Sequence, residues 1–418
     1  MKITLQKNNL IRIFGPALIN VAEGKICILG KIYGKGDKAI IHRMRSYALL
    51  ALEDSVLEVN LGSGGVLQEP EPNEEPLPEW LDFAEKIINE QLRKIIVLGP
   101  IDSGKSSVAV LLANMALNKG IKPVAIIDSD VGQADIGPPA FISVAKIENT
   151  IIWMRELKPA IMKFIGDIRP QYYVDKIINN VLDLLNRSFE KLKCKLVIID
   201  TDGWIQDMYA IEYKFKLIER ISPDAIIVLG KEYYNIFKRF EKLGIKVYEL
   251  KTPLVVKTRS RDERRKLRSE QYKKFLEESP VRRYELDNVV VLGNPLFEGE
   301  EVDVAQLSST AGVPVLYATR LPDSIHMVVQ QGNRNIQLDK IKESYGVNKV
   351  RYYVQGFEKG LYVALTDQDD SDYPGLIEGI DYANKIIHIR TSFEGYPKII
   401  KFSRIRLTKE FLEQLIIE

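Results

Sequence analysis

The chain has 418 residues, of which 45% are hydrophobic and 28% are charged, with a formal net charge of +2. At about 150 residues per domain this length indicates two or three domains, and the composition is that of a globular protein. The near balance of charge does not by itself indicate a nucleic-acid partner. We find no run of roughly 18 apolar residues and no signal peptide, so we expect no membrane association and a cytoplasmic location.

Cysteine and histidine are sparse. Cys27 and Cys194 lie in apolar surroundings and are expected to be buried packing residues rather than partners in a disulfide framework. The three histidines are far apart in the sequence, with no pair spaced for one helix face. We therefore expect no metal site built from protein ligands alone.

Four segments of different pattern follow one another. Alternating apolar runs predict a β-domain over 1–67. A proline- and glutamate-rich linker is predicted over 68–82, and we expect no helix or central strand from Gln68 to Trp80 because proline removes backbone donors and acidic residues resist burial. Buried-type strands separated by helical spacing predict an α/β domain over 83–285, and a β-rich domain is predicted over 286–418.

The α/β segment is expected to contain a parallel sheet with crossover helices. Its predicted strands are Lys94–Leu98, Val124–Asp128, Lys195–Asp200, Ala225–Leu229 and Lys246–Leu250. Apolar residues at helical intervals over Tyr172–Phe189 predict a helix that covers this sheet.

A phosphate-binding motif follows the first of these strands and precedes a helical pattern over Ser107–Asn118. Its residues, with the one after it, are Gly99, Pro100, Ile101, Asp102, Ser103, Gly104, Lys105, Ser106 and Ser107. The glycines let backbone N–H groups surround phosphate oxygens, Lys105 would neutralise the β- and γ-phosphates, and Ser106 would ligate Mg²⁺. The motif predicts binding of a nucleoside triphosphate, and it serves hydrolases, switches and kinases alike.

Acidic residues end the second strand, in Asp128-Ser-Asp-Val-Gly-Gln133. They are expected at the carboxyl edge of the sheet, where the phosphate loop also lies. A carboxylate here can hold Mg²⁺ through water or accept a proton from an attacking hydroxyl, and Gln133 can orient the nucleophile or a metal-bound water.

The third strand ends in Asp200-Thr-Asp-Gly203, which also matches the D-x-x-G of nucleotide-dependent switch proteins. No guanine-reading N-K-x-D or T-K-x-D follows the strand Ala225–Leu229, and Trp204 is unexpected in a switch loop. A guanine-specific switch is therefore disfavoured.

A basic segment follows the last strand of the α/β domain. Between Arg259 and Lys274 there are eight basic and three acidic residues. Helical spacing gathers several arginines on one broad face, which could close over a triphosphate and contact a polyanionic acceptor. The alternative is a solvated helix.

Together these motifs resemble the polynucleotide 5′-hydroxyl kinase family, which includes the kinase subunit of the messenger-RNA cleavage machinery and a ribosomal-RNA-processing relative. The family order is a phosphate loop, a D/E-x-D-x-G-Q box, a T-x-G-W clasp and an R-S-x-x-x-R-R-x-x-R lid. Here the clasp is Thr201-Asp202-Gly203-Trp204, and the lid motif Arg259–Arg268 lies in a lid segment over 256–278. The resemblance implies an α/β P-loop kinase core flanked by N-terminal and C-terminal β-rich domains.

The resemblance also implies an ATP- and Mg²⁺-dependent kinase that acts on the 5′-hydroxyl end of RNA or DNA, with RNA-processing proteins as possible partners. Asp130 would be the general base, with a tentative Mg²⁺ contact through water, and Gln133 would assist at the metal or the acceptor. The clasp would position the loop around the phosphates. Arg264 would touch the transferring phosphoryl group, with Arg259 and Arg268 beside it.

Two other classes stay open: an ATP-binding scaffold of an RNA-processing complex with little turnover, and a P-loop ATPase or nucleotide switch. No motif distinguishes RNA from DNA, or Asp200 from Asp202 as a further metal ligand. Arg45 and its neighbours are the only candidates for contacts with adenine.

Overall fold

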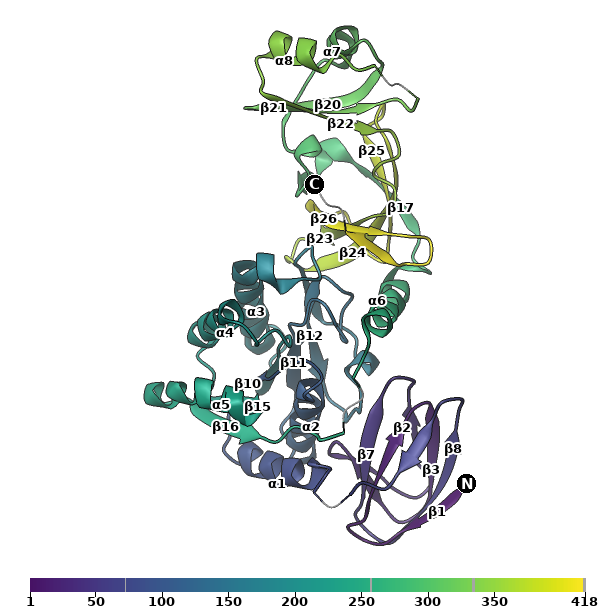
Figure 1. Cartoon of the computed structure of the whole chain (residues 1–418), viewed down its shortest axis with the longest axis vertical. Helices are drawn as coiled ribbons and strands as arrows, with labels where there is room; N and C mark the ends of the chain where they lie inside the picture. The colour runs from purple at the N-terminus through teal and green to yellow at the C-terminus, as the bar shows by residue number, and fades with distance from the viewer. Residues whose placement is uncertain (72, 256–257, 333–334, 416–418) are drawn as a thin grey trace. The chain divides into compact units, whose positions relative to one another are not determined.

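Figure 1 shows the computed structural model of the chain, which describes residues 1–71, 73–255, 258–332 and 335–415. The chain divides into two compact units. The first comprises Met1–Gly137, Ile142–Ile161 and Arg169–Glu263, and the second comprises Pro138–Phe141, Met162–Ile168 and the chain from Arg264. The longest segment of the second unit starts at Arg264, and the domain boundary after residue 285 stays a prediction.

Antiparallel strands of alternating burial open the first unit, as the sequence predicts for a β-domain. They form two sheets with the orders β1-β8-β3-β6 and β5-β4-β7-β2-β9. The strands are β1 Lys2–Leu5, β2 Leu10–Phe14, β3 Ala17–Glu23, β4 Ile26–Ile28, β5 Lys31–Tyr33, β6 Lys38–Ile41, β7 Ser46–Ala51, β8 Ser55–Leu61 and β9 Val66–Gln68. Buried residues of these strands belong to one hydrophobic cluster with residues of the α/β core, so both share a single core.

The predicted linker contains the start of a helix. Helix α1 runs over Leu77–Ile88, with Pro76 at its N-cap and a second proline in its first turn. The expectation that no helix forms before Trp80 was wrong, because proline fits the first turn, where its missing N–H has no helical partner. The expected exposure of the acids was also wrong at Glu74, which is 8% exposed and pairs with Arg12 at 2.7 Å.

The core sheet has the order β13-β12-β11-β14-β10-β15-β16. Its strands are β10 Lys94–Leu98, β11 Val124–Asp128, β12 Phe141–Ile147, β13 Ile161–Phe164, β14 Leu196–Asp200, β15 Ala225–Leu229 and β16 Lys246–Leu250. The five predicted strands are present and parallel, four with the predicted bounds. Strand β12 pairs antiparallel with β11, so the sheet is mixed.

Helices cover both faces of this sheet (Figure 1). They are α2 Lys105–Asn118, α3 Val174–Glu190, α4 Met208–Ile221 and α5 Lys231–Phe237, with short 3₁₀ turns η1 Met154–Glu156, η2 Pro170–Tyr172 and η3 Lys238–Leu243. The chain leaves β10 in one direction along the sheet, through β11 and β12 to β13, and then returns in the other direction through β14 and β15 to β16. Because crossovers are right-handed, α2 lies on one face and α3 and α4 lie on the other. The carboxyl ends of β10, β11 and β14 meet at this switch point, where ligands of open α/β sheets bind.

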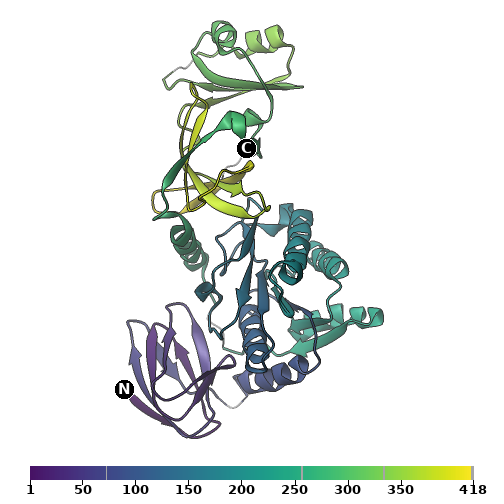
Figure 2. The same ribbon diagram turned by 180° about the vertical axis from the view of Figure 1, so that it is seen from behind.

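The second unit is rich in strands, as predicted for the C-terminal segment (Figure 2). One sheet has the order β17-β25-β24-β23-β26-β18, with β27 on β26, and another has the order β19-β20-β21-β22. The strands are β17 Val281–Glu285, β18 Val290–Leu292, β19 Glu300–Glu301, β20 Val315–Leu321, β21 Ser324–Val329, β22 Lys349–Val354, β23 Leu361–Thr366, β24 Asp372–Asp381, β25 Ile386–Thr391, β26 Ile399–Leu407 and β27 Glu413–Leu415. The helices are α7 Val304–Ala311 and α8 Leu338–Tyr345, with turns η4 Leu286–Asn288 and η5 Pro295–Phe297.

Helix α6, Arg261–Leu276, carries most of the predicted lid and passes from the first unit into the second. Positions 256–257 of that lid lie outside the described residues. In the part of the chain that the structure describes, no helix is both long enough and apolar enough to cross a membrane.

Candidate functional site

The phosphate loop joins β10 to α2, as the motif predicts. Gly104 is the N-cap of α2 and has a φ of 101°, a left-handed conformation that favours glycine. A Cβ atom there would approach the ring of Trp80 to 2.8 Å. The first turn of α2 therefore presents its backbone N–H groups to the edge of the sheet, as anion-binding helix N-termini do.

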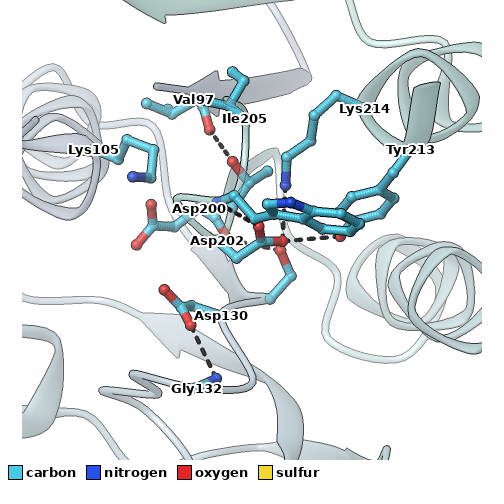
Figure 3. A network of polar contacts seen from close by, with 12 residues as sticks. Val97, Lys105, Asp130, Gly132, Asp200, Asp202, Ile205, Tyr213 and Lys214 are labelled. Atoms are coloured by element: carbon cyan, nitrogen blue, oxygen red, sulfur yellow. Dashed lines mark hydrogen bonds and ion pairs between the residues drawn. The ribbon is translucent and has the colours of Figure 1, made fainter. Parts of the chain in front are cut away.

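Lys105 folds back over this loop and donates a hydrogen bond from Nζ to the Pro100 carbonyl at 2.7 Å. The residue is 7% exposed, and burial lowers the pKa of its amine although Asp200 and Asp130 act in the opposite direction. The amine of Lys105 and these two carboxylates lie around one space (Figure 3). A positive charge therefore stands where anionic phosphates would enter.

Asp200, the last residue of β14, is joined to the phosphate loop. The Ser106 hydroxyl donates to Asp200 Oδ2 at 2.6 Å. The other oxygen, Asp200 Oδ1, is buried and has no hydrogen-bond partner among the described residues. Burial raises the pKa of Asp200 to about 7, although Lys105 and Ser106 lower it. A hydroxyl and a carboxylate oxygen without a partner form an oxygen donor set of the kind that Mg²⁺ prefers.

The two acids of the box after β11 have different surroundings. Asp128 Oδ2 accepts hydrogen bonds from the backbone N–H groups of Asp135 and Ile136 at 2.7 and 3.0 Å, which holds the box in its fold. Asp130 accepts from the N–H groups of Gly132 and Gln133 through Oδ1 alone, at 3.0 and 2.8 Å. Burial raises the pKa of Asp130, and the charge of Asp202 raises it further. A raised pKa suits a carboxylate that accepts a proton near neutral pH.

Asp202 in the clasp is held by an internal cation. Lys214 of α4 is fully buried and donates to Asp202 Oδ2 at 2.8 Å, and the Tyr213 hydroxyl donates to the same oxygen at 3.1 Å (Figure 3). Burial lowers the pKa of Lys214, while Asp202 raises it. Asp202 therefore anchors the clasp to α4.

The other clasp residues fix the clasp against the phosphate loop. Thr201 Oγ1 donates to the Val97 carbonyl of β10 at 2.8 Å. Gly203 packs against Ile101, and a Cβ atom there would come within 2.7 Å of the Ile101 backbone nitrogen. This position requires glycine because any side chain would displace the loop. The clasp thus contacts both β10 and the phosphate loop, and its role in positioning the loop around phosphates stays a prediction.

The side chains of Trp204 and Gln133 donate hydrogen bonds to residues close to them in the sequence. The Trp204 indole donates to Asp207 at 2.6 Å and stacks on Tyr213 with ring centroids 6.0 Å apart. Gln133 Nε2 donates to the Gly132 carbonyl at 2.8 Å. Both residues belong to the loops that surround Asp130 and Asp202.

A cavity of about 100 Å³ opens beside the start of α2. Its walls come from the N-terminal strands, from α1 and from the chain after β16. The lining residues are Arg12, Leu29, Ser46, Tyr47, Ala48, Glu75, Leu77, Trp80, Gly104, Ser107, Pro253 and Val255. The neighbours of Arg45 thus line the cavity, whereas Arg45 itself pairs with Asp135.

The predicted lid arginines fall in different units. Arg259 belongs to the first unit, and its backbone N–H points to Asp102 of the phosphate loop at 3.5 Å. Arg264 and Arg268 belong to the second unit, where Arg268 Nε donates to both carboxylate oxygens of Glu413 at 2.8 and 2.9 Å. The structure thus brings together the loop, box and clasp, and the grouping of Arg264 with them stays a prediction.

Two buried residues that contact the clasp were not predicted from the sequence. Lys214 and Tyr213 lie within a helix whose letters suggest an ordinary amphipathic pattern. The available signal is the spacing of Lys214 twelve residues after Asp202, which puts one turn of α4 beside the clasp. The pairing of Asp202 in the clasp with the buried Lys214 was not predicted.

This loop, acid pair and clasp at the carboxyl edge of a doubly wound sheet define a P-loop nucleotide-binding protein. The sequence model of the mRNA cleavage and polyadenylation factor CLP1 P-loop matches residues 99–278. The chain is 33% identical over 354 residues to a polyribonucleotide 5′-hydroxyl-kinase of Pyrococcus furiosus, covering 82% of this chain and 96% of that protein. It is 35% identical over 327 residues to one of Methanocaldococcus jannaschii, covering 75% and 87%.

A solved structure of Clp1p with Pcf11p matches the fold, with a TM-score of 0.64 at 12% identity over 97% of this chain and 98% of that chain. This similarity extends across both compact units. The chain belongs to the polyribonucleotide 5′-hydroxyl-kinase family that is related to CLP1.

Proposed function

We propose that the protein is an ATP-dependent kinase that transfers the γ-phosphoryl group of ATP to the 5′-hydroxyl end of RNA. The observation that carries this proposal is the carboxylate of Asp130, which stands by Lys105 of the phosphate loop and has a raised pKa. A triphosphate site alone fits many reactions, and this neighbouring base suits a hydroxyl acceptor. The relatives named as polyribonucleotide 5′-hydroxyl-kinases support RNA as the acceptor.

In the proposed reaction the 5′-hydroxyl oxygen attacks the γ-phosphorus in line while Asp130 takes the hydroxyl proton. The new O–P bond forms as the bond between the γ-phosphorus and the β,γ-bridging oxygen breaks, and ADP leaves. Lys105 offsets the charge on the phosphates, and the N–H groups at the start of α2 hold them. Gln133 orients the acceptor through the loop that it shares with Asp130. Arg264 is the proposed contact of the transferring phosphoryl group, with Arg259 and Arg268 beside it.

Ser106 and Asp200 are the residues that would hold Mg²⁺, and the partnerless Asp200 Oδ1 supports this choice. When bound, the ion supplies positive charge to the β- and γ-phosphate oxygens. The sequence also suggests Asp130 as a water-mediated Mg²⁺ ligand, but its Oδ1 oxygen already accepts two backbone hydrogen bonds. Asp202 is engaged by Lys214 and Tyr213.

The cavity beside Ser107 is the proposed site of the adenine base. It lies next to the first turn of α2, so a base there can belong to the nucleotide whose phosphates occupy the loop. Tyr47 and Trp80 provide aromatic walls, and Arg12 and Glu75 provide polar edges. RNA-processing proteins are the proposed partners, by analogy with the Pcf11p that accompanies Clp1p in the solved structure.

The test is transfer of radiolabelled γ-phosphate with three acceptors: 5′-hydroxyl RNA, 5′-hydroxyl DNA and none. We expect labelled RNA from the wild type and none from Lys105→Ala. Arg187→Ala on α3 is a control for loss of a cation in the same unit. ATP hydrolysis that ignores the acceptor would indicate an ATPase instead, and tight ATP binding without turnover would indicate a scaffold.

A further inference from the structure

Two arginines bind the carboxylate of Asp135, five residues beyond Asp130, and the charge of a third acts on it. Arg45 precedes β7 and pairs with Asp135 through Nη2, and Arg155 of η1 donates from Nε to Asp135 Oδ1 at 2.9 Å. Arg259 is close enough for its charge to lower the pKa of Asp135. We call Arg45, Arg155 and Arg259 the arginine cluster. All belong to the first unit.

Trp153 lies against two arginines of the cluster. The guanidinium groups of Arg45 and Arg155 lie 4.7 and 5.1 Å from its ring, and the His42 ring is tilted by 50° against it with centroids 4.7 Å apart. The side chains of Arg45 and Arg155 are only 15% and 11% exposed. These contacts hold the arginines in fixed positions before any ligand arrives.

Two N–H donors in this group lack an acceptor. The indole Nε1 of Trp153 and the Nε of Arg259 are buried and make no hydrogen bond within the described part of the chain. Buried donors are almost always paired, so a pair of partnerless donors indicates a group that binds there. Both would donate to an oxygen acceptor.

Positive charge also gathers around Asp135. Its carboxylate is bonded to the guanidinium groups of Arg45 and Arg155, and the charge of Arg259 acts on it as well. The negative charge of Asp102 acts on Arg259 and that of Asp200 acts on Arg45, but Asp200 is bonded to Ser106 in the phosphate site. A partly buried excess of positive charge is unfavourable unless an anion offsets it. Arginine forks match phosphate oxygens in geometry, so a phosphate group is the fitting anion.

We infer that the arginine cluster binds the first phosphodiester group of the acceptor strand, the one that follows the 5′-terminal nucleoside. The phosphate loop already supplies donors for the phosphates of ATP, whereas the cluster is built around Asp135, five residues after the proposed base in the same loop. Asp128 fixes that spacing by binding the backbone N–H of Asp135. This inference rests on the proposed function, because it assumes a 5′-hydroxyl polynucleotide acceptor.

The test is a double-mutant cycle between the protein and the acceptor, measured as KM for a 5′-hydroxyl RNA oligonucleotide. The variants are Arg155→Gln and Arg45→Gln, with Arg220→Gln at the exposed C-terminal end of α4 as the matched control. The acceptors carry a neutral methylphosphonate at the first linkage, at the fifth linkage or at none. The KM for ATP is measured in parallel.

We expect Arg155→Gln to raise the acceptor KM roughly tenfold, as loss of one charged hydrogen bond does, with the KM for ATP unchanged. The first-linkage methylphosphonate should raise the wild-type KM by a similar factor and should add little in the variant. The salt dependence of the acceptor KM should weaken by about 0.7 in its log–log slope for one lost contact.

Additive effects, or an Arg155→Gln response equal to that of Arg220→Gln, would overturn the inference. A rise in the KM for ATP instead would assign the anion to the nucleotide. If Arg155→Gln does not fold, the wild type decides: equal KM values for the first-linkage and fifth-linkage methylphosphonates overturn the inference. A wild type that labels no 5′-hydroxyl acceptor would overturn the proposed function, and this inference with it.

Discussion

The acid box and the segment Asp200–Trp204, which is Asp200 followed by the clasp, have the same local pattern: two aspartates separated by one residue, the first of them ending a buried parallel strand. Asp128 and Asp200 are even direct neighbours in register across β11 and β14. Yet the roles are reversed between the two regions. In the box the first acid binds backbone N–H groups and the second stands by Lys105, whereas in the segment Asp200–Trp204 the first acid stands by Ser106 and the second pairs with Lys214.

The reversal shows that partners, rather than position in a motif, decide which acid is available for chemistry. Each region uses one carboxylate to hold its loop in place. In the box the partners are N–H groups of the same loop, and in the clasp the partner is a buried cation on the following helix. Substitutions at the two kinds of acid should therefore affect different properties.

A large effect on activity is expected at Asp200. Asp200→Asn should lower kcat/KM roughly a thousandfold, because it removes the charged oxygen proposed to hold Mg²⁺ beside Ser106. The measurement is steady-state transfer to 5′-hydroxyl RNA over a range of Mg²⁺ concentrations, with unfolding in urea as the control for stability. A variant with wild-type Mg²⁺ dependence would remove Asp200 from the metal site.

The buried ion pair of the clasp should dominate stability. Lys214→Met should lower the free energy of unfolding by about 3 to 5 kcal/mol, because it leaves Asp202 buried without its cation. The matched control is Lys216→Met in the same helix, whose pair with Glu212 is half-exposed and should contribute less than about 1 kcal/mol. Equal losses in urea unfolding for the two variants would contradict the assigned role of Asp202.

The carboxylate of Asp135, just after the acid box, should make the stability of the protein depend on pH. Burial alone would raise the pKa of Asp135, but Arg45 and Arg155 outweigh burial and lower it to about 2. A lowered folded pKa contributes stability that is present above the unfolded value near 4 and lost as the pH falls through 2. At pH 5 the free energy of unfolding of the wild type should exceed that of Asp135→Asn by about 2 kcal/mol from this source, and the difference should be smaller at pH 2.5.

The measurement is the free energy of unfolding of both proteins in urea at several pH values. Asp128 provides the opposite case, since burial and the charge of Asp200 hold its pKa well above the ordinary range. A gap between wild type and Asp135→Asn that stays constant with pH would contradict the assigned charge state of Asp135.

The smallest effect is expected from the clasp hydroxyl. Thr201→Val removes the buried hydrogen bond to the Val97 carbonyl and should lower stability by about 1 kcal/mol. Thr201→Ser keeps the hydroxyl and serves as the control. Equal stability of the valine and serine variants in thermal unfolding would show that the packing of Gly203 alone fixes the clasp.

The core sheet could be predicted because its strands are unbroken apolar runs and the phosphate motif lies between one strand and a helix. The start of α1 was missed because proline was treated as excluding a helix, although the first turn accepts it. The antiparallel strand β12 was missed as well. Its pairing with β11 is a tertiary feature that no local pattern specifies.

The candidate site was predictable in its residues but not in its partners. The motifs selected Lys105, Ser106, Asp130 and the clasp, and all of these lie around the same edge. The choice between Asp200 and Asp202 depends on Lys214, which is brought to the clasp only by the packing of α4. The arginine cluster draws on three distant segments, so no short motif could show it.

The most direct test of the proposed base compares Asp130→Asn with Asp128→Asn in single-turnover transfer of labelled γ-phosphate to 5′-hydroxyl RNA. Asparagine keeps an oxygen that can accept the bonds from Gly132 and Gln133, so Asp130→Asn should fold normally and lose about 10²- to 10⁴-fold in rate. Asp128→Asn should lose stability and retain transfer wherever it is folded. A folded Asp130→Asn that transfers phosphate at the wild-type rate would contradict the account.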